Sequence, residues 1–253
     1  MVKLNEIVKF LDEFLFINEI PDSSNNGLQV QGNEKVTKVA VCVDACISAF
    51  EKAKEQGAEL IICHHGLSWK DSLKYITNNN YKRISYLIKN GISLYAAHLP
   101  LDMHKQIGNN ILFAKMLKLV NIKPFGRFEK YFIGYKGEFE ISQNIDNVIA
   151  IINKNLNTSF KVLPFGNHNI KTVAIISGKG GSDMLKEAIN DNIDLFITGE
   201  ISHGHYHIAK EGNINVIAAG HYKTETLGVK AIASVLKHKF DIDYVFIDVP
   251  TGL

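Results

Sequence analysis

Apolar and polar positions along the chain predict an alternation of helices and short buried strands. Residues 4–16 place apolar side chains at helical spacing, at Ile7, Val8, Leu11, Phe14 and Leu15. Further helices are predicted at 48–56, 81–90, 109–119, 183–190 and 226–238. Short apolar runs predict strands at 39–43, 60–63, 92–97, 173–177, 194–198, 214–219 and 243–248. This alternation is typical of an α/β fold with parallel sheets.

One predicted strand runs directly into two adjacent histidines. The stretch 60–66, LIICHHG, ends in His64, His65 and Gly66. In open α/β sheets, ligands bind beyond the carboxyl ends of the strands. Neighbouring residues on a strand point to opposite faces, so both rings can face one site only if the strand has turned, and Gly66 permits that turn. From these residues alone, a polar loop after a core strand and a metal site both stay open.

The two halves of the chain resemble each other. Residues 39–66, VAVCVDACISAFEKAKEQGAELIICHHG, align with residues 173–200, VAIISGKGGSDMLKEAINDNIDLFITGE. The next strand also repeats, as ISLYAAH at 92–98 and INVIAAGH at 214–221. This self-similarity predicts an ancient internal duplication that produced two similar α/β lobes.

The repeat also predicts the domain organisation. We expect a single domain of two lobes, at 1–120 and 170–253, joined by a connecting segment at 121–169. That segment carries at least one strand and a helix near 147–155. Strand ends would supply candidate site residues from both lobes, namely His64, His65, His98 and Asp102 from the first and Glu200 and His221 from the second. We expect them to meet in a cleft between the lobes, where small-molecule sites are common.

Composition narrows the class of protein. The chain has 253 residues and a formal net charge of +2, so nothing indicates a nucleic-acid or anionic-membrane partner. No stretch is long and apolar enough to cross a bilayer, and the N-terminal pattern is amphipathic rather than that of a signal peptide. Three cysteines, Cys42, Cys46 and Cys63, lie in apolar segments and look reduced. These features predict a cytoplasmic protein.

A second candidate ligand pair lies near the C-terminus. His221 and Glu225 are four residues apart in GHYKTETLG, which on a helical turn places both side chains on one face. With His64, His65 and Asp102 they form a set of three histidines and two carboxylates. That set suits zinc, iron or manganese, and two ions can share it if one carboxylate bridges. The alternative is that His221 begins a helix and Glu225 is merely solvated.

Two further patterns are weaker. Among the histidines of GEISHGHYH, we expect His203 to support the site indirectly and His205 and His207 to lie at the surface. The glycine-rich turn at 178–181, GKGG, could present backbone N–H groups to a phosphate. However, a turn between a strand and a helix needs glycine in any case, and the Walker pattern is absent.

Four motifs together resemble a known family. CHHG, AAHLPLD, TGEISH and GHYKTETLGV, in this order and spacing, are similar to the NIF-three-like family, whose members are also called GTP cyclohydrolase 1 type 2 homologues. The resemblance runs from the N-terminal helix and the NNGLQVQG loop to the closing FIDVPTG. It implies two similar three-layer α/β/α lobes with a dinuclear metal site between them, two divalent ions per chain, and a toroidal homohexamer.

The resemblance also implies roles for individual residues. It assigns the metal ligands to His64, His65, Asp102, His221 and a bridging Glu225. His98 is the candidate catalytic proton shuttle, and Glu200 and His203 are expected to line the pocket. The chain departs from the family at 24–26, at Leu99 and Pro100, and at Gly204. No departure removes a predicted ligand, but they leave the identity of the substrate open.

The implied function is metal-dependent hydrolysis of a small molecule. Two ions held by histidines and carboxylates would form a metal-bound hydroxide near neutral pH, and His98 would act as acid or base. The resemblance implies GTP as the substrate, which makes hydrolysis of a purine-ring C–N bond the first expectation and a nucleotide the first substrate class. The alternatives are a metal-dependent phosphoesterase or a metal-binding scaffold or regulatory protein, because fold alone does not decide function.

Overall fold

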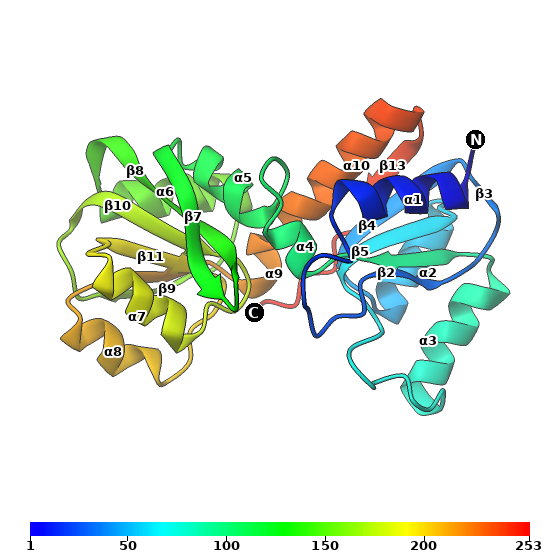
Figure 1. Cartoon of the computed structure of the whole chain (residues 1–253), viewed down its shortest axis with the longest axis horizontal. Helices are drawn as coiled ribbons and strands as arrows, with labels where there is room; N and C mark the ends of the chain where they lie inside the picture. Colours follow the sequence, from blue (N-terminus) through cyan, green and yellow to red (C-terminus); the bar gives the residue numbers. More distant parts are fainter. The chain divides into compact units, whose positions relative to one another are not determined.

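The computed structural model describes residues 1–253, which divide into two compact units. Unit 1 contains residues 1–101 and 228–249, and unit 2 contains residues 102–227 and 250–253. Each unit has its own central sheet (Figure 1). No helix combines the length and the apolar character that crossing a membrane requires.

Unit 1 is built on a five-stranded sheet. Its strand order is β13 (Asp243–Phe246), β4 (Lys38–Asp44), β5 (Leu60–His65), β6 (Ser93–Ala96) and β2 (Gly27–Val30). The first four strands are parallel, and β2 pairs antiparallel with β6. Strands β4 and β5 are buried along almost their whole length, which explains why their sequences are continuous apolar runs. A short ribbon of β1 (Val2–Lys3) and β3 (Lys35–Val36) lies outside this sheet.

Helices cover both faces of the unit 1 sheet. Helices α2 (Ile47–Glu55) and α3 (Asn78–Lys89) pack Phe50, Ile84 and Leu87 against Ala40 and Cys42. The side chains of Val39 and Val41 point to the opposite face. There Figure 1 shows α1 (Leu4–Phe14) and α10 (Thr226–Phe240), which meet edge to face through Phe10 and Phe240.

Unit 2 is built on a six-stranded sheet. Its strand order is β7 (Val120–Phe128), β8 (Tyr131–Asn144), β10 (Asn169–Ile176), β11 (Leu195–Thr198), β12 (Asn215–Ala218) and β9 (Lys161–Pro164). The three strands β10, β11 and β12 are parallel, and the flanking strands are antiparallel to their neighbours. Helices α5 (Asn109–Met116) and α6 (Ile145–Leu156) pack on one face, and α7 (Ser182–Asn190) and α8 (His205–Glu211) pack on the other. The short helices α4 (Leu99–Asp102) and α9 (His221–Thr224) carry site residues.

The α/β class and the main elements predicted from the sequence are present, with boundaries that shift by a few residues. The structure places β13 in unit 1, where Tyr244 pairs with Val39, although the sequence placed this strand in the second lobe. It also places β7, β8 and α6, predicted as a connecting segment at 121–169, in the sheet and helix layers of unit 2. The reason is that β8 pairs along much of β10 and so extends the sheet. Common ancestry of the two halves stays a prediction, although both sheets contain a central parallel triplet of the same order.

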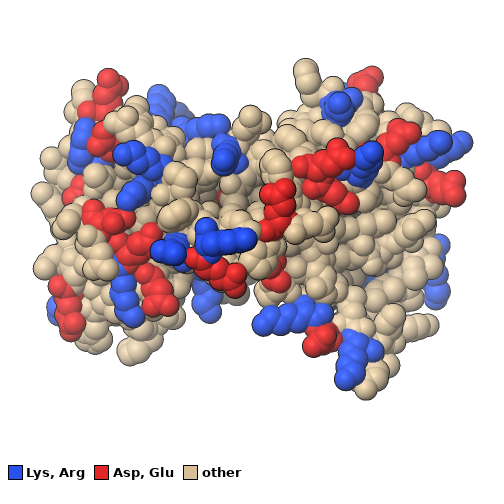
Figure 2. All heavy atoms as spheres, in the orientation of Figure 1, with Lys and Arg blue, Asp and Glu red and all other residues tan.

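The surface carries both signs of charge. On the face seen in Figure 2, basic and acidic side chains are interspersed, and neither sign forms a continuous field. This pattern agrees with the formal net charge of +2 and gives no electrostatic argument for a polyanionic partner.

Candidate metal centre

Two adjacent histidines of unit 1, His64 and His65, lie where β5 ends and the chain turns. His65 neighbours Asp44, the last residue of β4, across the parallel pair of strands. The turn that follows is tight, because a Cβ atom at Gly66 would lie 2.6 Å from the Ala96 Cβ and would overlap the Gln29 side chain. Gln29 Oε1 accepts hydrogen bonds from the backbone N–H groups of the next two residues, at 2.7 and 3.1 Å. The glycine is therefore required by close approach of neighbouring atoms.

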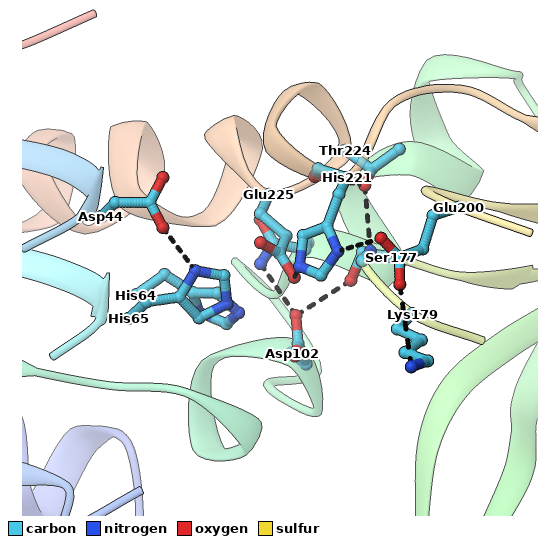
Figure 3. Close-up of polar contacts among 12 residues, drawn as sticks. Asp44, His64, His65, Asp102, Ser177, Lys179, Glu200, His221, Thr224 and Glu225 are labelled. Atoms are coloured by element: carbon cyan, nitrogen blue, oxygen red, sulfur yellow. Dashed lines mark hydrogen bonds and ion pairs between the residues drawn. The ribbon is translucent and has the colours of Figure 1, made fainter. Parts of the chain in front are cut away.

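Each of these histidines is oriented through its Nδ1 atom. The buried His64 ring donates from Nδ1 to the Ala97 carbonyl oxygen at 2.9 Å. The His65 ring donates from Nδ1 to Asp44 Oδ1 at 2.8 Å, as Figure 3 shows. Metal-ligating histidines in proteins are typically held in this way by a carbonyl or carboxylate. In both rings Nε2 is then the nitrogen that can be offered to a metal ion.

His98 belongs to the same cluster. Its Nδ1 atom lies 2.9 Å from Asp22 Oδ1, and its backbone N–H donates to Asn26 Oδ1 at 2.8 Å. Each of the three histidines offers a ring nitrogen, and these nitrogens lie within 4.8 Å of one another. Unit 1 therefore gathers three imidazoles at the carboxyl ends of two neighbouring strands.

Asp22 organises the loop beneath His98. Its side chain, which is 2% exposed, also accepts hydrogen bonds from the Leu99 N–H at 2.9 Å and from Asn26 Nδ2 at 2.9 Å. Burial by itself would raise the pKa of the Asp22 carboxyl. The hydrogen bond and the charge of His98, with hydrogen bonds from Asn26 and Ser24, outweigh burial and lower that pKa below 3.8. The carboxylate is thus charged and fixed.

Two elements of unit 2, β10 and α5, position the Asp102 carboxylate. Asp102 ends α4 and is 6% exposed. Its Oδ1 atom accepts from Ser177 Oγ at 2.9 Å and from Asn109 Nδ2 at 2.8 Å. Ser177 directly follows β10, and Asn109 begins α5. Figure 3 shows the contact with Ser177, and the two contacts together fix the carboxylate at the carboxyl end of the parallel strands.

The candidate ligand pair of unit 2, His221 and Glu225, lies on and just after α9. His221 Nε2 is 3.3 Å from Glu225 Oε1, and His221 Nδ1 is 3.3 Å from Glu200 Oε2. Burial would lower the pKa of His221, but hydrogen bonds and charge from Glu225 and Glu200 raise it to about 9. Glu225 is 3% exposed, so the alternative of a merely solvated carboxylate is wrong. Lys179 Nζ lies 4.0 Å from Glu200 Oε1 (Figure 3).

The glycine-rich turn at 178–181 packs against this pair. Gly178 has a φ of +60°, and a Cβ atom there would overlap Glu225 Oε1 and lie 3.1 Å from His221 Nε2. The Gly178 N–H donates to Thr224 Oγ1 at 3.0 Å, and the Gly180 N–H donates to Thr198 Oγ1 at 2.8 Å. Two N–H groups of the turn are therefore engaged within unit 2, which disfavours a phosphate site there. The turn instead lets the backbone approach the carboxylate closely.

Comparison with known proteins decides the family. A family model described as Duf34/NIF3 (NGG1p interacting factor 3) matches residues 2–252. The chain belongs to the Duf34/NIF3 family. Two curated relatives are named GTP cyclohydrolase 1 type 2 homolog. The one from Pyrococcus horikoshii is 46% identical over 250 residues, covering 98% of this chain and 99% of the relative. The one from Archaeoglobus fulgidus is 42% identical over 252 residues, covering all of both chains.

Solved structures of similar proteins have the same fold. A crystal structure of a protein from Thermus thermophilus matches with a TM-score of 0.92 and 38% identity, covering all of both chains. Reduced HcgD from Methanocaldococcus jannaschii matches with a TM-score of 0.86 and 28% identity, covering 98% of each chain. The mixed α/β fold predicted for this Duf34/NIF3 protein is thereby confirmed.

The structure groups the predicted site residues by unit. Unit 1 brings together His64, His65 and His98, and unit 2 brings together Glu200, His221 and Glu225 and fixes Asp102. Histidine and acidic side chains that could hold a metal ion are thus present, and their roles as ligands stay predictions.

One prediction for the histidines of GEISHGHYH is wrong. His205, expected at the surface, is 2% exposed. Both of its ring nitrogens have partners, because Nδ1 lies 2.9 Å from Ser202 Oγ and Nε2 lies 3.0 Å from the Gly180 oxygen. These contacts satisfy the buried ring. His203, by contrast, is exposed.

Sequence reasoning missed the residues that orient the candidate ligands. Asp44 ends β4 as His65 ends β5, so a register argument could have found this pair. Asp22 lies in a polar loop and meets His98 across 76 residues of sequence. No local pattern indicates a partner at that distance.

Proposed function

We propose that this protein is a dinuclear metal-dependent hydrolase of the GTP cyclohydrolase 1 type 2 kind. In this proposal His64 and His65 of unit 1 and Asp102, His221 and Glu225 of unit 2 would hold two divalent ions, with Glu225 as the ligand that both ions would share. The reaction is hydrolytic opening of a C–N bond in a purine ring, and GTP is the first substrate to test because the curated relatives carry that name.

The observation that carries the proposal is the orientation of the donor atoms. His64 and His65 are held through Nδ1, and Asp102 is held by Ser177 and Asn109. A histidine and carboxylate donor set of this kind suits zinc, iron or manganese. Structural thiolate sites are disfavoured, because burial raises the pKa of the Cys42 and Cys63 thiols and keeps them protonated.

The proposed chemistry divides between the ions and the side chains. Divalent ions in such a site supply Lewis-acid polarisation and activation of water near neutral pH. His98 is the proposed acid–base group. The Asp22 carboxylate engages its Nδ1 atom, which leaves Nε2 as the nitrogen that would give or take a proton. The Asp22 interaction also fixes the ring orientation that proton transfer requires.

Unit 2 offers space for a small molecule beside its own Glu200. A pocket of about 330 Å³ lies at the carboxyl ends of β11 and β12, lined by Phe160, Lys161, Glu200 and Ile201 among others. An aromatic ring with a few charged groups is typical of small-ligand sites. We propose that the pocket accommodates the part of the substrate that is not being cleaved, and that the protein works in the cytoplasm as a toroidal homohexamer.

Metal content and turnover of the same preparations test the proposal. The unaltered protein, purified without chelator, is expected to hold about two divalent ions per chain and to hydrolyse GTP to a ring-opened product that chromatography resolves. His65→Ala should lower both the metal content and the turnover. His207→Ala, at an exposed position, is the matched control and should change neither.

The outcomes separate the alternatives. Stoichiometric metal with cleavage of a phosphate ester rather than the ring would replace the cyclohydrolase reaction with a phosphoesterase reaction. Stoichiometric metal with no turnover of any nucleotide would favour the scaffold or regulatory role. Absence of stoichiometric metal from every preparation would refute the dinuclear proposal itself. Light scattering on the same samples tests the hexamer.

A further inference from the structure

We propose that unit 1 binds one divalent ion by itself, on the Nε2 atoms of His64, His65 and His98, before unit 2 contributes ligands. This inference rests on the proposed function, because it concerns how that metal centre is loaded. It adds His98 to the metal ligands as the third nitrogen of a capture site.

The first support is the placement of the three rings. Their centroids are 4.7 Å apart for His64 and His65, 5.0 Å for His64 and His98, and 5.6 Å for His65 and His98. One ring nitrogen of each lies within 4.8 Å of the others. Ligand nitrogens about 2.0–2.1 Å from a tetrahedral zinc ion are roughly 3.3 Å apart. Small ring movements are therefore enough to close the set around an ion.

The second support is that each of the three rings is held through its own Nδ1 atom. A carbonyl oxygen can only accept, so His64 Nδ1 carries the proton that it donates to Ala97. Asp44 and Asp22 accept from the Nδ1 atoms of His65 and His98 in the same way. In the neutral form each ring therefore offers its Nε2 lone pair. Packing alone does not require three independent acceptors to select one tautomer.

The third support is charge. Three neutral imidazoles around a divalent ion leave two positive charges to be balanced. Asp44 and Asp22 lie directly behind His65 and His98, and two carboxylates balance two charges. Carboxylates in this position also raise the basicity of the ligating ring. This makes the set suitable for a cation and unsuitable for an anion.

Trp69 forms a wall beside the cluster. Its ring lies edge to face with His98 at 5.0 Å and is 6.0 Å from His65. Its Nε1 donates to the Gly66 oxygen at 2.8 Å, which fixes the indole against the turn. The chain contains one tryptophan, so its intrinsic tryptophan fluorescence reports on this cluster alone.

The donor set defines which ions bind. Three nitrogens with an open position suit zinc, cobalt(II) and iron(II), whereas magnesium and calcium prefer oxygen ligands. While His98 binds the ion, its Nε2 atom cannot transfer protons. The acid–base role proposed above therefore begins only after the ion has moved to the complete ligand set.

The decisive variant removes every ligand of unit 2 from the full chain, as Asp102→Ala, His221→Ala and Glu225→Ala together. After chelator treatment it is titrated with Co²⁺, followed by Trp69 fluorescence and by equilibrium dialysis. We expect quenching and about one ion per chain. Adding His98→Ala to this background should weaken binding at least about tenfold. His238→Ala, at an exposed position of unit 1, is the matched control and should leave the affinity unchanged, and Mg²⁺ should give no response.

Two outcomes would overturn the inference: a folded triple variant that binds no cobalt, or one that keeps its affinity after His98→Ala. Circular dichroism checks the fold. Should the triple variant not fold, histidine-selective nitrogen NMR of the unaltered protein with less than one equivalent of zinc decides instead. The Nε2 resonances of the unit 1 histidines should shift before those of His221, and the reverse order would refute the capture site.

The same titration distinguishes this inference from the proposed function. Two ions in the unaltered protein and none in the triple variant would leave the dinuclear proposal standing and refute the capture site. One ion in both, lost on His98→Ala, would support the capture site and refute the dinuclear centre.

Discussion

The two units position their candidate metal ligands by different means. In unit 1 each histidine is oriented by an acceptor at Nδ1, supplied by a carbonyl or an aspartate. In unit 2 the carboxylates are buried, and a network of hydroxyl, amide and imidazole groups holds them. Imidazoles can be buried neutral at modest cost, whereas buried carboxylates need hydrogen bonds or charge partners. Unit 2 therefore depends more strongly on its supporting residues than unit 1 does.

The largest effect on stability is expected from placing a side chain at Gly178, where the backbone lies close to Glu225. In Gly178→Val, a side chain would meet Glu225 and His221, and the positive φ would disfavour a β-branched residue. We expect the free energy of unfolding to fall by about 4 kcal/mol, from backbone strain plus overpacking. Urea denaturation of the chelated protein measures this change.

The matched control lies in the same turn. Gly181 has open space around it and occupies the N-cap position of α7, where serine is favoured, so Gly181→Ser should be neutral or slightly stabilising. Similar losses in both variants would show that the turn itself is fragile and that the contact with Glu225 is not the cause.

An intermediate effect is expected from removing one carboxylate in each unit. Asp102→Ala takes an acceptor away from Ser177 and Asn109 in a buried setting and should cost about 2 kcal/mol in the chelated protein. Asp44→Ala should lower the free energy of unfolding by less than about 1 kcal/mol, because the Asp44 side chain is 34% exposed. Thermal or urea unfolding of the two variants side by side tests the difference between the units. Equal costs would contradict the stronger dependence of unit 2.

The sequence predicts the ends of strands better than the partners of side chains. The apolar runs at 39–43 and 60–63 indicated buried parallel strands, and the structure has β4 and β5 there. The spacing of His221 and Glu225 also predicted their contact correctly. Both signals are local, because each depends on a few neighbouring residues.

Features that depend on distant pairing could not be predicted in this way. Four residues of β13 look like any short strand, and only their pairing with residues 38–41 assigns them to unit 1. Burial of His205 depends on acceptors and donors from Gly180 and Ser202, which a pattern of alternate histidines does not reveal. Sequence periodicity indicates which residues are buried, but it does not indicate which groups form hydrogen bonds with the buried polar side chains.

The smallest effect is a dependence on pH that distinguishes unit 2. The pKa of His221 is about 9 in the folded chain against 6.5 for an unperturbed histidine, so its contribution to stability is complete below pH 6.5 and is lost as pH rises through 9. Between pH 6.5 and 9 we expect the free energy of unfolding of the chelated protein to fall by on the order of 1 kcal/mol, because solvent screens the charge of a partly exposed ring. Melting temperatures of the unaltered protein and of His221→Gln, measured across this range, test the assignment. The variant cannot lose a proton at this position, so its profile should be flatter. An unchanged profile would assign the pH dependence to other groups and remove this distinction between the two ligand sets.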